Sequence, residues 1–220
     1  MASQYCNLLA QLFTYWTWFM FWWHTVTFLG DSAFTVPCAL AIAIWLSING
    51  LWKQTVRWLL CFGVAMALVV VTKLLFMGWN IAPPFINFTG ISGHSASATA
   101  VYLTAAFLFS NEKSERTRML VIAAAIVFSI VIGLSRLAIK VHSESEVVIG
   151  LLTGAVAAWC FCRAFDGSKR TLRGKYVFVA LSVFMLMGTT GKPAPTQGFL
   201  QDVAQMLSGR DMVYYRTIPL

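Results

Sequence analysis

The strongest constraint on this chain is a series of long apolar runs separated by short gaps, several of which are basic. Each run approaches the roughly 20 residues that a helix needs to cross the hydrocarbon of a membrane. Backbone polar groups find no water in lipid, so such runs fold as helices. The pattern predicts an all-α fold, a polytopic membrane bundle of about six transmembrane helices. The expected spans are Ala33–Asn49, Val56–Met77, His94–Ser110, Met119–Arg136, Val147–Cys162 and Tyr176–Thr190.

Composition supports the membrane assignment. Hydrophobic residues make up 59% of the 220 residues and charged residues only 11%, whereas a soluble domain carries about a quarter charged residues. One small core cannot bury so many apolar side chains, so lipid must cover part of the surface. We therefore expect an integral membrane protein in contact with membrane lipids.

Both ends of the chain differ from the predicted core at 31–190. The segment 1–30 contains the aromatic stretch Leu8–Leu29, which is compatible with a span or with a helix lying in the membrane interface. It has neither a basic start nor a small-residue cleavage site, so we do not expect a removable signal peptide. In the tail, 191–220, the weakly amphipathic stretch Phe199–Leu207 predicts a short surface helix.

The basic gaps predict the orientation of the bundle, because loops rich in Lys and Arg stay in the cytoplasm. This places Gly50–Thr55, Asn111–Arg118 and Arg163–Lys175 inside. The loops Gly78–Gly93 and Leu137–Glu146 then lie on the outer face, as does the tail from Gly191. In a bacterium this would be the periplasmic face of the inner (plasma) membrane.

The charge and cysteine counts exclude other classes of protein. The net charge of +8 comes from Lys and Arg in the short gaps, not from a stripe with stacking aromatics, so we expect no nucleic-acid partner. The cysteines lie in or beside apolar runs and are odd in number, which argues against a disulfide framework. They are Cys6, Cys38, Cys61, Cys160 and Cys162.

A first polar constellation, Ile91-Ser92-Gly93-His94, stands where an outer loop enters an apolar run. Ser92 can cap the helix, and Gly93 lets the backbone approach a ligand. A helix N-terminus favours an anion such as phosphate. His94 could donate a proton to a leaving alkoxide. The alternative is an interfacial helix start with an incidental histidine.

A second constellation starts at Ser135-Arg136 and includes His142 and Glu146. Because His142 and Glu146 are four residues apart, they share one face of a helix. A carboxylate on one imidazole nitrogen sets the tautomer and leaves the other nitrogen free to attack. Arg136 offers a planar fork for phosphate. The alternative is an outer loop with solvated charges.

Lys73 lies near the outer end of an apolar span, where it either serves a function or extends to the interface. The spans bring Lys73, Arg136, the two histidines and Glu146 to one face of the membrane. These groups suffice for phosphoryl transfer, and we expect neither a metal nor a cofactor.

These motifs resemble those of the type 2 phosphatidic-acid phosphatase superfamily, which shares its site with vanadium haloperoxidases. That family carries three motifs in order. The first is Lys, six residues and then Arg-Pro, and the second is Pro-Ser-Gly-His. The third is Ser-Arg, five residues, His, three residues and then Asp. Ser135-Arg136, His142 and Glu146 match the third motif in spacing, with Glu in place of Asp. Ile91-Ser92-Gly93-His94 lacks only the Pro of the second. The resemblance covers roughly Asp31 to Cys162.

The resemblance implies a role for each motif residue. His142 would attack phosphorus and form a phosphohistidine, while Glu146 holds its ring and His94 protonates the leaving group. The implied phosphate-binding set is Lys73, Arg136, Ser92, Gly93, Ser135 and Asn80. Asn80 and Ile81 stand where the family has Arg-Pro, so one phosphate-binding arginine is missing from the first motif.

The location of the site predicts a lipid phosphate as substrate, because the lipid tail can stay in the bilayer. Polyprenyl diphosphate, phosphatidic acid, phosphatidylglycerol phosphate and a phosphorylated glycolipid are all compatible with the sequence. A lipid phosphotransferase would use the same residues, and a lipid-binding subunit with little activity is a third interpretation. A channel would place polar residues along the helices, whereas here they gather at one end. The sequence indicates no oligomeric state.

Overall fold

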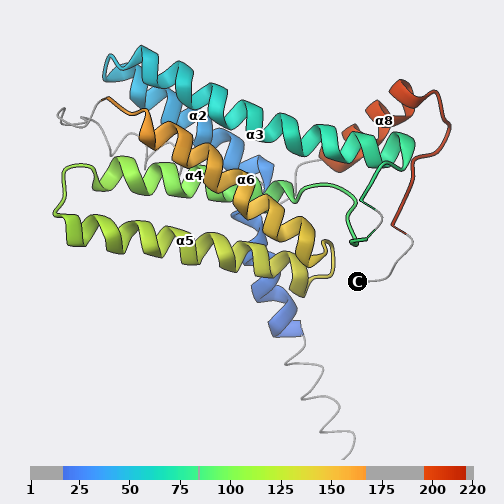
Figure 1. Ribbon diagram of the computed structural model, residues 1–220. Coiled ribbons are helices and arrows are strands. Elements are labelled where there is room, and N and C mark those ends of the chain that lie inside the picture. Colours follow the sequence, from blue (N-terminus) through green and yellow to red (C-terminus); the bar gives the residue numbers. More distant parts are fainter. Residues whose placement is uncertain (1–16, 84, 167–195, 217–220) are drawn as a thin grey trace, which may run out of the picture.

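The computed structural model describes residues 17–83, 85–166 and 196–216, and in these ranges it contains helices and no strand. Residues 17–28 are helical, and six further helices follow (Figure 1). These are α2 (Ser32–Ile48), α3 (Trp52–Trp79), α4 (Gly93–Ser110), α5 (Glu115–Ala138), α6 (Glu144–Arg163) and α8 (Thr196–Ser208). The predicted all-α fold is confirmed for this part of the chain. Helices α2 to α6 match the first five predicted spans to within about one turn.

Four helical stretches are long and apolar enough to cross a membrane: Thr17–Ile48, Trp52–Trp79, Glu115–Ala138 and Glu144–Arg163. The protein is therefore a membrane protein by its fold as well as by its composition. Helix α4 is not among the four, and the predicted span Tyr176–Thr190 lies outside the described residues. The total of about six spans stays a prediction.

The N-terminal helical residues 17–28 run at a steep angle to the bundle helices (Figure 1). A turn at residues 29–31 separates them from α2. Their large side chains are exposed, with 60% of Trp18 and 64% of Trp22 accessible. The choice between a span and an interfacial helix stays a prediction for this segment. Residues 1–16, including Cys6, are outside the described part.

Helix α4 lies at the centre of the bundle, and twelve of its 18 residues are buried. It packs most extensively against α6 and α5. Small residues on α6 permit a close approach: a Cβ on Gly150 would lie 2.7 Å from the Ser92 carbonyl oxygen, and one on Gly154 would lie 2.7 Å from Thr99 Cβ. Small residues commonly allow such contacts between membrane helices. This packing brings the start of α4 beside the start of α6, where Ser92 N–H donates to the Glu146 carbonyl oxygen at 3.1 Å.

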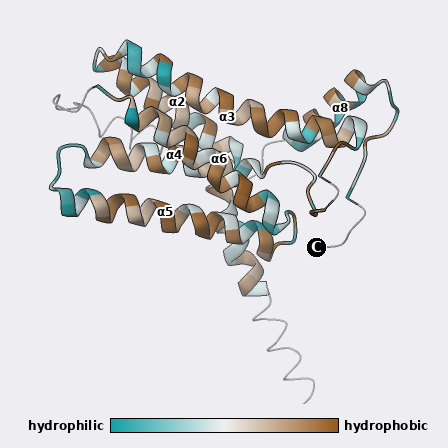
Figure 2. Ribbon diagram, in the orientation of Figure 1, coloured by the Kyte–Doolittle hydropathy of each residue, from teal (hydrophilic) through white to brown (hydrophobic). Residues whose placement is uncertain are grey.

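Consecutive helices run in alternating directions, so their ends gather into two groups (Figure 1). The starts of α2, α4 and α6 meet the ends of α3 and α5; we call this the site end. The opposite end carries Arg57, which donates to the Ala164 carbonyl and lies 3.8 Å from Asp166. Polar loops occupy both ends, and apolar surface lies between them (Figure 2). The alternation agrees with the predicted loops, while the membrane face of each end stays a prediction.

Around Trp45, Trp58 and Phe161 lies a large apolar cluster, and the buried Trp58 indole N–H donates to the Ala39 carbonyl oxygen at 2.8 Å. No disulfide joins the cysteines that the structure describes, which are Cys38, Cys61, Cys160 and Cys162.

Helix α8 contains the predicted short helix at Phe199–Leu207 and lies beside the end of α3 (Figure 1). Leu200 and Ala204 pack there against Phe76 and Met77. The opposite face of α8 is exposed, with 67% of Phe199 accessible. The tail thus returns to the site end of the bundle.

Candidate active site

The pair formed by His142 and Glu146 is built around the N-terminus of α6. Ser143 caps this helix: its hydroxyl accepts from the Glu146 backbone N–H, and the Glu146 carboxylate accepts from Ser143 N–H. This capping box fixes the start of the helix and turns the Glu146 side chain back toward His142. His142 Nδ1 lies 2.6 Å from Glu146 Oε2. Glu146 is fully buried, and 11% of the His142 side chain is exposed.

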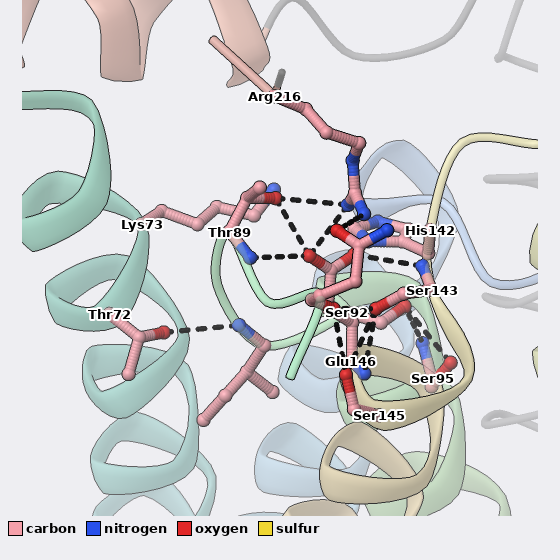
Figure 3. Close-up of polar contacts among 12 residues, drawn as sticks. Thr72, Lys73, Thr89, Ser92, Ser95, His142, Ser143, Ser145, Glu146 and Arg216 are labelled. Atoms are coloured by element: carbon pink, nitrogen blue, oxygen red, sulfur yellow. Dashed lines mark hydrogen bonds and ion pairs between the residues drawn. The ribbon is translucent and has the colours of Figure 1, made fainter. Parts of the chain in front are cut away.

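Five hydrogen bonds hold the Glu146 carboxylate (Figure 3). Oε1 accepts from Thr89 N–H at 2.6 Å, from the Thr89 hydroxyl at 2.7 Å and from Arg216 Nη2 at 2.7 Å. Oε2 accepts from Ser143 N–H at 3.2 Å and pairs with His142. A carboxylate that accepts this many bonds is held ionised and in one orientation. It therefore sets the His142 tautomer with the proton on Nδ1.

The α3–α4 loop covers this pair and is anchored on both sides. The Ser143 and Ser145 hydroxyls donate to the Asn87 carbonyl oxygen. On the α3 side, Ile91 N–H donates to Thr72 Oγ1 at 3.2 Å. Gly90 has φ 137°, and a Cβ there would lie 2.6 Å from Lys73 Cγ. The loop backbone therefore rests directly on the Lys73 side chain, and only glycine fits.

His94 forms a second histidine–carboxylate pair. It is the second residue of α4, which Ser92 caps by accepting from Ser95 N–H. His94 Nε2 lies 3.3 Å from Asp31 Oδ2. Asp31 is 4% exposed and caps α2 through Oδ1, which accepts from Ala33 N–H at 2.8 Å. Asp31 therefore orients the His94 ring from a rigid position.

Two cations complete the cluster. Arg136 Nη1 donates to Thr27 Oγ1 at 2.7 Å, while its buried Nε has no partner in the described part of the chain. Lys73 Nζ donates to Gln197 Oε1 at 3.3 Å. His94 interacts electrostatically with Arg136 and with His142. The structure thus brings together five predicted site residues: His142, Glu146, His94, Arg136 and Lys73.

The environment of His142 favours the neutral imidazole. Burial lowers the pKa of His142 from its usual value of 6.5, and the positive charges of Lys73 and Arg136 lower it further. The hydrogen bond and the charge of Glu146 raise the pKa but do not cancel the effect of burial. A neutral ring with its proton on Nδ1 carries a lone pair on Nε2, so His142 is prepared for nucleophilic attack.

An open cavity of about 470 Å³ gives access to this histidine. Its walls come from the α3–α4 loop, the end of α5 and the start of α6. His142 and Lys140 both line it, together with Ile86, Asn87, Leu137 and Ser143. The cavity therefore lies at the site end of the bundle and is lined by both apolar and cationic side chains.

Four further predicted residues have mainly structural surroundings. Ser135 is fully buried and donates to the Ile132 carbonyl oxygen at 2.6 Å. Asn80 is exposed and ends α3 in the left-handed conformation, with φ 56°. Ser92 is buried at the cap of α4, and Gly93 lies against Val69. In the described ranges, no hydrogen bond links the side chains of Ser135, Asn80 or Ser92 to His94 or His142.

Sequence reasoning did not find Asp31, Thr27, Thr89 or Arg216. The only signal among them is Asp31, which follows Gly30 directly before an apolar run, as a helix cap does. Arg216 gives no such signal, because it lies 70 residues from Glu146 and beyond the family resemblance. In the described ranges, no group of three or more His, Cys, Asp or Glu residues could hold a metal ion.

The fold and the site together define a helical membrane protein with two histidine–carboxylate pairs at one end of its bundle. The profile of the PAP2 superfamily matches residues 81–170 of this chain. A Klebsiella pneumoniae relative, "Uncharacterized 22.5 kDa protein in cps region", is 33% identical over 200 residues, which cover 89% of this chain and 96% of the relative. No solved structure matches the chain.

The chain belongs to the PAP2 superfamily, as its motifs predicted. Members of this family are phosphatases, so the family supports phosphatase chemistry as the general kind of reaction. The matched region contains the second and third motifs and begins after Lys73.

Proposed function

We propose that this protein is a membrane lipid phosphatase that hydrolyses a phosphomonoester or diphosphate of a lipid through a phosphohistidine on His142. One observation carries the proposal. Glu146, which is fully buried, holds His142 Nδ1 at 2.6 Å, and Nε2 has no partner among the described residues. An oriented imidazole with one free nitrogen is the arrangement that nucleophilic catalysis needs.

In the first step, His142 Nε2 forms a bond to phosphorus as the bond to the lipid oxygen breaks. His94, as the imidazolium, gives the proton on its Nδ1 to that departing oxygen, while Asp31 holds its Nε2. In the second step, a water molecule attacks phosphorus and the P–N bond breaks. The water proton passes to His94, which returns to its starting state, and inorganic phosphate leaves. Glu146 stays ionised throughout.

Positive groups would stabilise the charge that builds up on the phosphoryl oxygens. Arg136 has an unpartnered Nε and a side chain held by Thr27. Lys73 adds a second cation, and the N-terminus of α4 adds backbone N–H groups and the positive end of a helix dipole. Preorganised donors of this kind usually make the largest contribution to catalysis.

The surroundings of the site support a lipid substrate. Large apolar side chains of the α3–α4 loop, which forms part of the cavity wall, are exposed, with 95% of Phe85 and 56% of Ile81 accessible. The exposed Trp18 and Trp22 of helix 17–28 have the character of interfacial anchors. A lipid can keep its tail in the bilayer while its phosphate reaches His142. We propose the inner membrane of a bacterium, with the site facing the periplasm, because the two basic gaps that the structure describes in full, Gly50–Thr55 and Asn111–Arg118, lie at the opposite end.

The test compares purified wild type with His142→Ala on phosphatidic acid, a polyprenyl diphosphate and a phosphorylated glycolipid, in detergent micelles with EDTA. His24→Ala is the matched control, because His24 is an exposed histidine on helix 17–28. We expect wild type and His24→Ala to release phosphate, and His142→Ala to lose about 10³-fold or more in rate. Equal release by wild type and His142→Ala would overturn the proposal.

Two additions to this assay separate the mechanistic alternatives. Release of free phosphate with no acceptor lipid supports hydrolysis over phosphotransfer. A ³²P-labelled substrate should leave an acid-labile label on wild-type protein during turnover and none on His142→Ala. Loss of activity with EDTA would contradict a site that works through cationic side chains alone.

A further inference from the structure

We propose that the C-terminal segment is part of the catalytic site and that Arg216 is a positioning residue for the pair formed by His142 and Glu146. We call residues 196–216, which comprise α8 and the chain after it, the C-terminal arm. The proposal deepens the lipid-phosphatase function proposed above and rests on it.

The arm is docked onto the bundle by its own contacts. Leu200, Ala204 and Val213 form a buried apolar cluster with Phe76 and Met77 at the end of α3. Beyond α8, Tyr214 N–H donates to the Met77 carbonyl oxygen at 2.9 Å. These contacts fix the direction of the chain before it reaches Arg216, so the position of Arg216 does not depend on its own side chain.

Arg216 reaches from the arm into the centre of the site (Figure 3). Its Nη1 donates to Asn87 Oδ1, and its Nη2 donates to Glu146 Oε1 at 2.7 Å and to Thr89 Oγ1 at 3.1 Å. The guanidinium thus joins the α3–α4 loop to the first turn of α6. Only 17% of the Arg216 side chain is exposed, so solvent screens its ion pair with Glu146 weakly.

The charge of Glu146 explains why a cation is needed there. A fully buried carboxylate requires a positive partner to stay ionised. His142 cannot supply that charge in the resting enzyme, because its imidazole must be neutral to attack phosphorus. Arg216 makes the permanent ion pair with Glu146, and thereby leaves His142 free to be neutral.

A second contact links the arm to the other side of the site. Gln197, in the first turn of α8, accepts from Lys73 Nζ at 3.3 Å. The arm therefore touches a proposed phosphate-binding lysine and the carboxylate that orients the nucleophile. It also brings a guanidinium to the site end, where Asn80 occupies the position of the arginine expected from the first motif.

Removing Arg216 should change how His142 titrates. The groups that act on His142 are Lys73 from α3, His94 from α4, Arg136 from α5 and Glu146 from α6. Without Arg216, Glu146 loses its ion-paired cation, and Lys73 acts on it only through its charge. His142 then becomes the hydrogen-bonded partner that best balances the carboxylate, which raises the pKa of His142. The acid limb of kcat/KM should then move to higher pH.

The experiment compares Arg216→Ala, Arg216→Gln and Arg216→Lys in the full chain, on the lipid phosphate that wild type hydrolyses best. Arg210→Ala is the matched control, because Arg210 is an exposed arginine of the same arm that stacks on Tyr214 at 4.7 Å. We expect Arg216→Ala and Arg216→Gln to lower kcat about ten- to hundred-fold, the effect of losing a charged hydrogen bond. Both variants should also move the acid limb of kcat/KM to higher pH. Arg216→Lys should keep the limb near its wild-type position, and Arg210→Ala should behave as wild type.

Each outcome decides one question. If His142→Ala stays active, the proposed function fails. If His142→Ala is inactive while Arg216→Ala matches wild type in kcat and in pH profile, the proposal for Arg216 fails alone. A lower kcat with an unmoved acid limb would show that Arg216 serves stability only, which also overturns the positioning role. Where Arg216→Ala does not fold, the difference between Arg216→Gln and Arg216→Lys gives the same answer.

Discussion

The substitution Glu146→Gln tests the orientation of the nucleophile, because it keeps the size of the side chain and replaces one oxygen with an NH₂ group. Oε1 of Glu146 receives three donors, two from Thr89 and one from Arg216. Oε2 receives Ser143 N–H and pairs with His142. The single amide oxygen should therefore take the Oε1 position, where it avoids placing an NH₂ group against three donors.

The amide NH₂ then faces His142 Nδ1, which must become an acceptor. The imidazole proton moves to Nε2, and the lone pair needed for attack on phosphorus is lost. The Ser143 N–H also loses its acceptor. An inverted tautomer of a catalytic histidine costs about 10⁴-fold in kcat in a well-studied triad. We therefore expect a decrease of about 10³- to 10⁴-fold, which corresponds to about 4–5.5 kcal/mol of activation free energy.

The assay is phosphate release in detergent micelles at saturating substrate, with the folded state checked by thermal unfolding. Glu115→Gln is the matched control, since Glu115 is an exposed glutamate in the first turn of α5 at the opposite end of the bundle. Glu146→Asp keeps a carboxylate and should retain far more activity than Glu146→Gln. A folded Glu146→Gln variant with more than about a tenth of wild-type kcat would refute the orientation argument.

Three other predictions follow from the geometry. The pKa of His142 lies below its usual value of 6.5, so the neutral nucleophile persists on acidification. The acid limb of the kcat/KM profile should therefore have its midpoint below pH 6.5. A midpoint at or above pH 6.5 would contradict the effect of burial. If His94 is the general acid, His94→Ala should lose much more activity on a lipid phosphate than on p-nitrophenyl phosphate, whose leaving group needs no proton; equal losses on both would assign His94 another role. Gly154→Ala should lower the free energy of unfolding by about 1–3 kcal/mol, since its Cβ would lie 2.7 Å from Thr99 Cβ. Gly63→Ala is the control and should not lower it, because a Cβ there has nothing within 4 Å. Equal melting temperatures of the two variants in detergent would contradict the tight packing of α4 and α6.

The helices and part of the site were predictable because their causes are local. Lipid forces each long apolar run to satisfy its own backbone, so the runs alone indicate α2 to α6. The contact between His142 and Glu146 follows from their spacing and from the Ser143 cap. Nothing local indicated Asn80 as the exposed end of α3, because a helix terminus depends on the loop that follows it.

The partners of the motif residues depended on contacts between distant segments. Asp31 meets His94 across the start of two helices, and Thr89 and Arg216 meet Glu146 from a loop and from the C-terminal arm. Such pairs arise when the helices have packed, so no spacing in the chain reveals them. The small residues at Gly150 and Gly154 let α4 and α6 approach closely enough for their N-termini to meet.

The sequence by itself therefore determined that this is a helical membrane protein of the PAP2 superfamily with its polar motifs at one end. It could do so because hydrophobic length, positive-inside bias and four-residue spacing are properties of single segments. Only the tertiary structure decided that Asp31 orients His94 and that Arg216 pairs with Glu146. Those ion pairs need groups from separate segments to be buried side by side, and only the packed bundle and its docked arm bring them together.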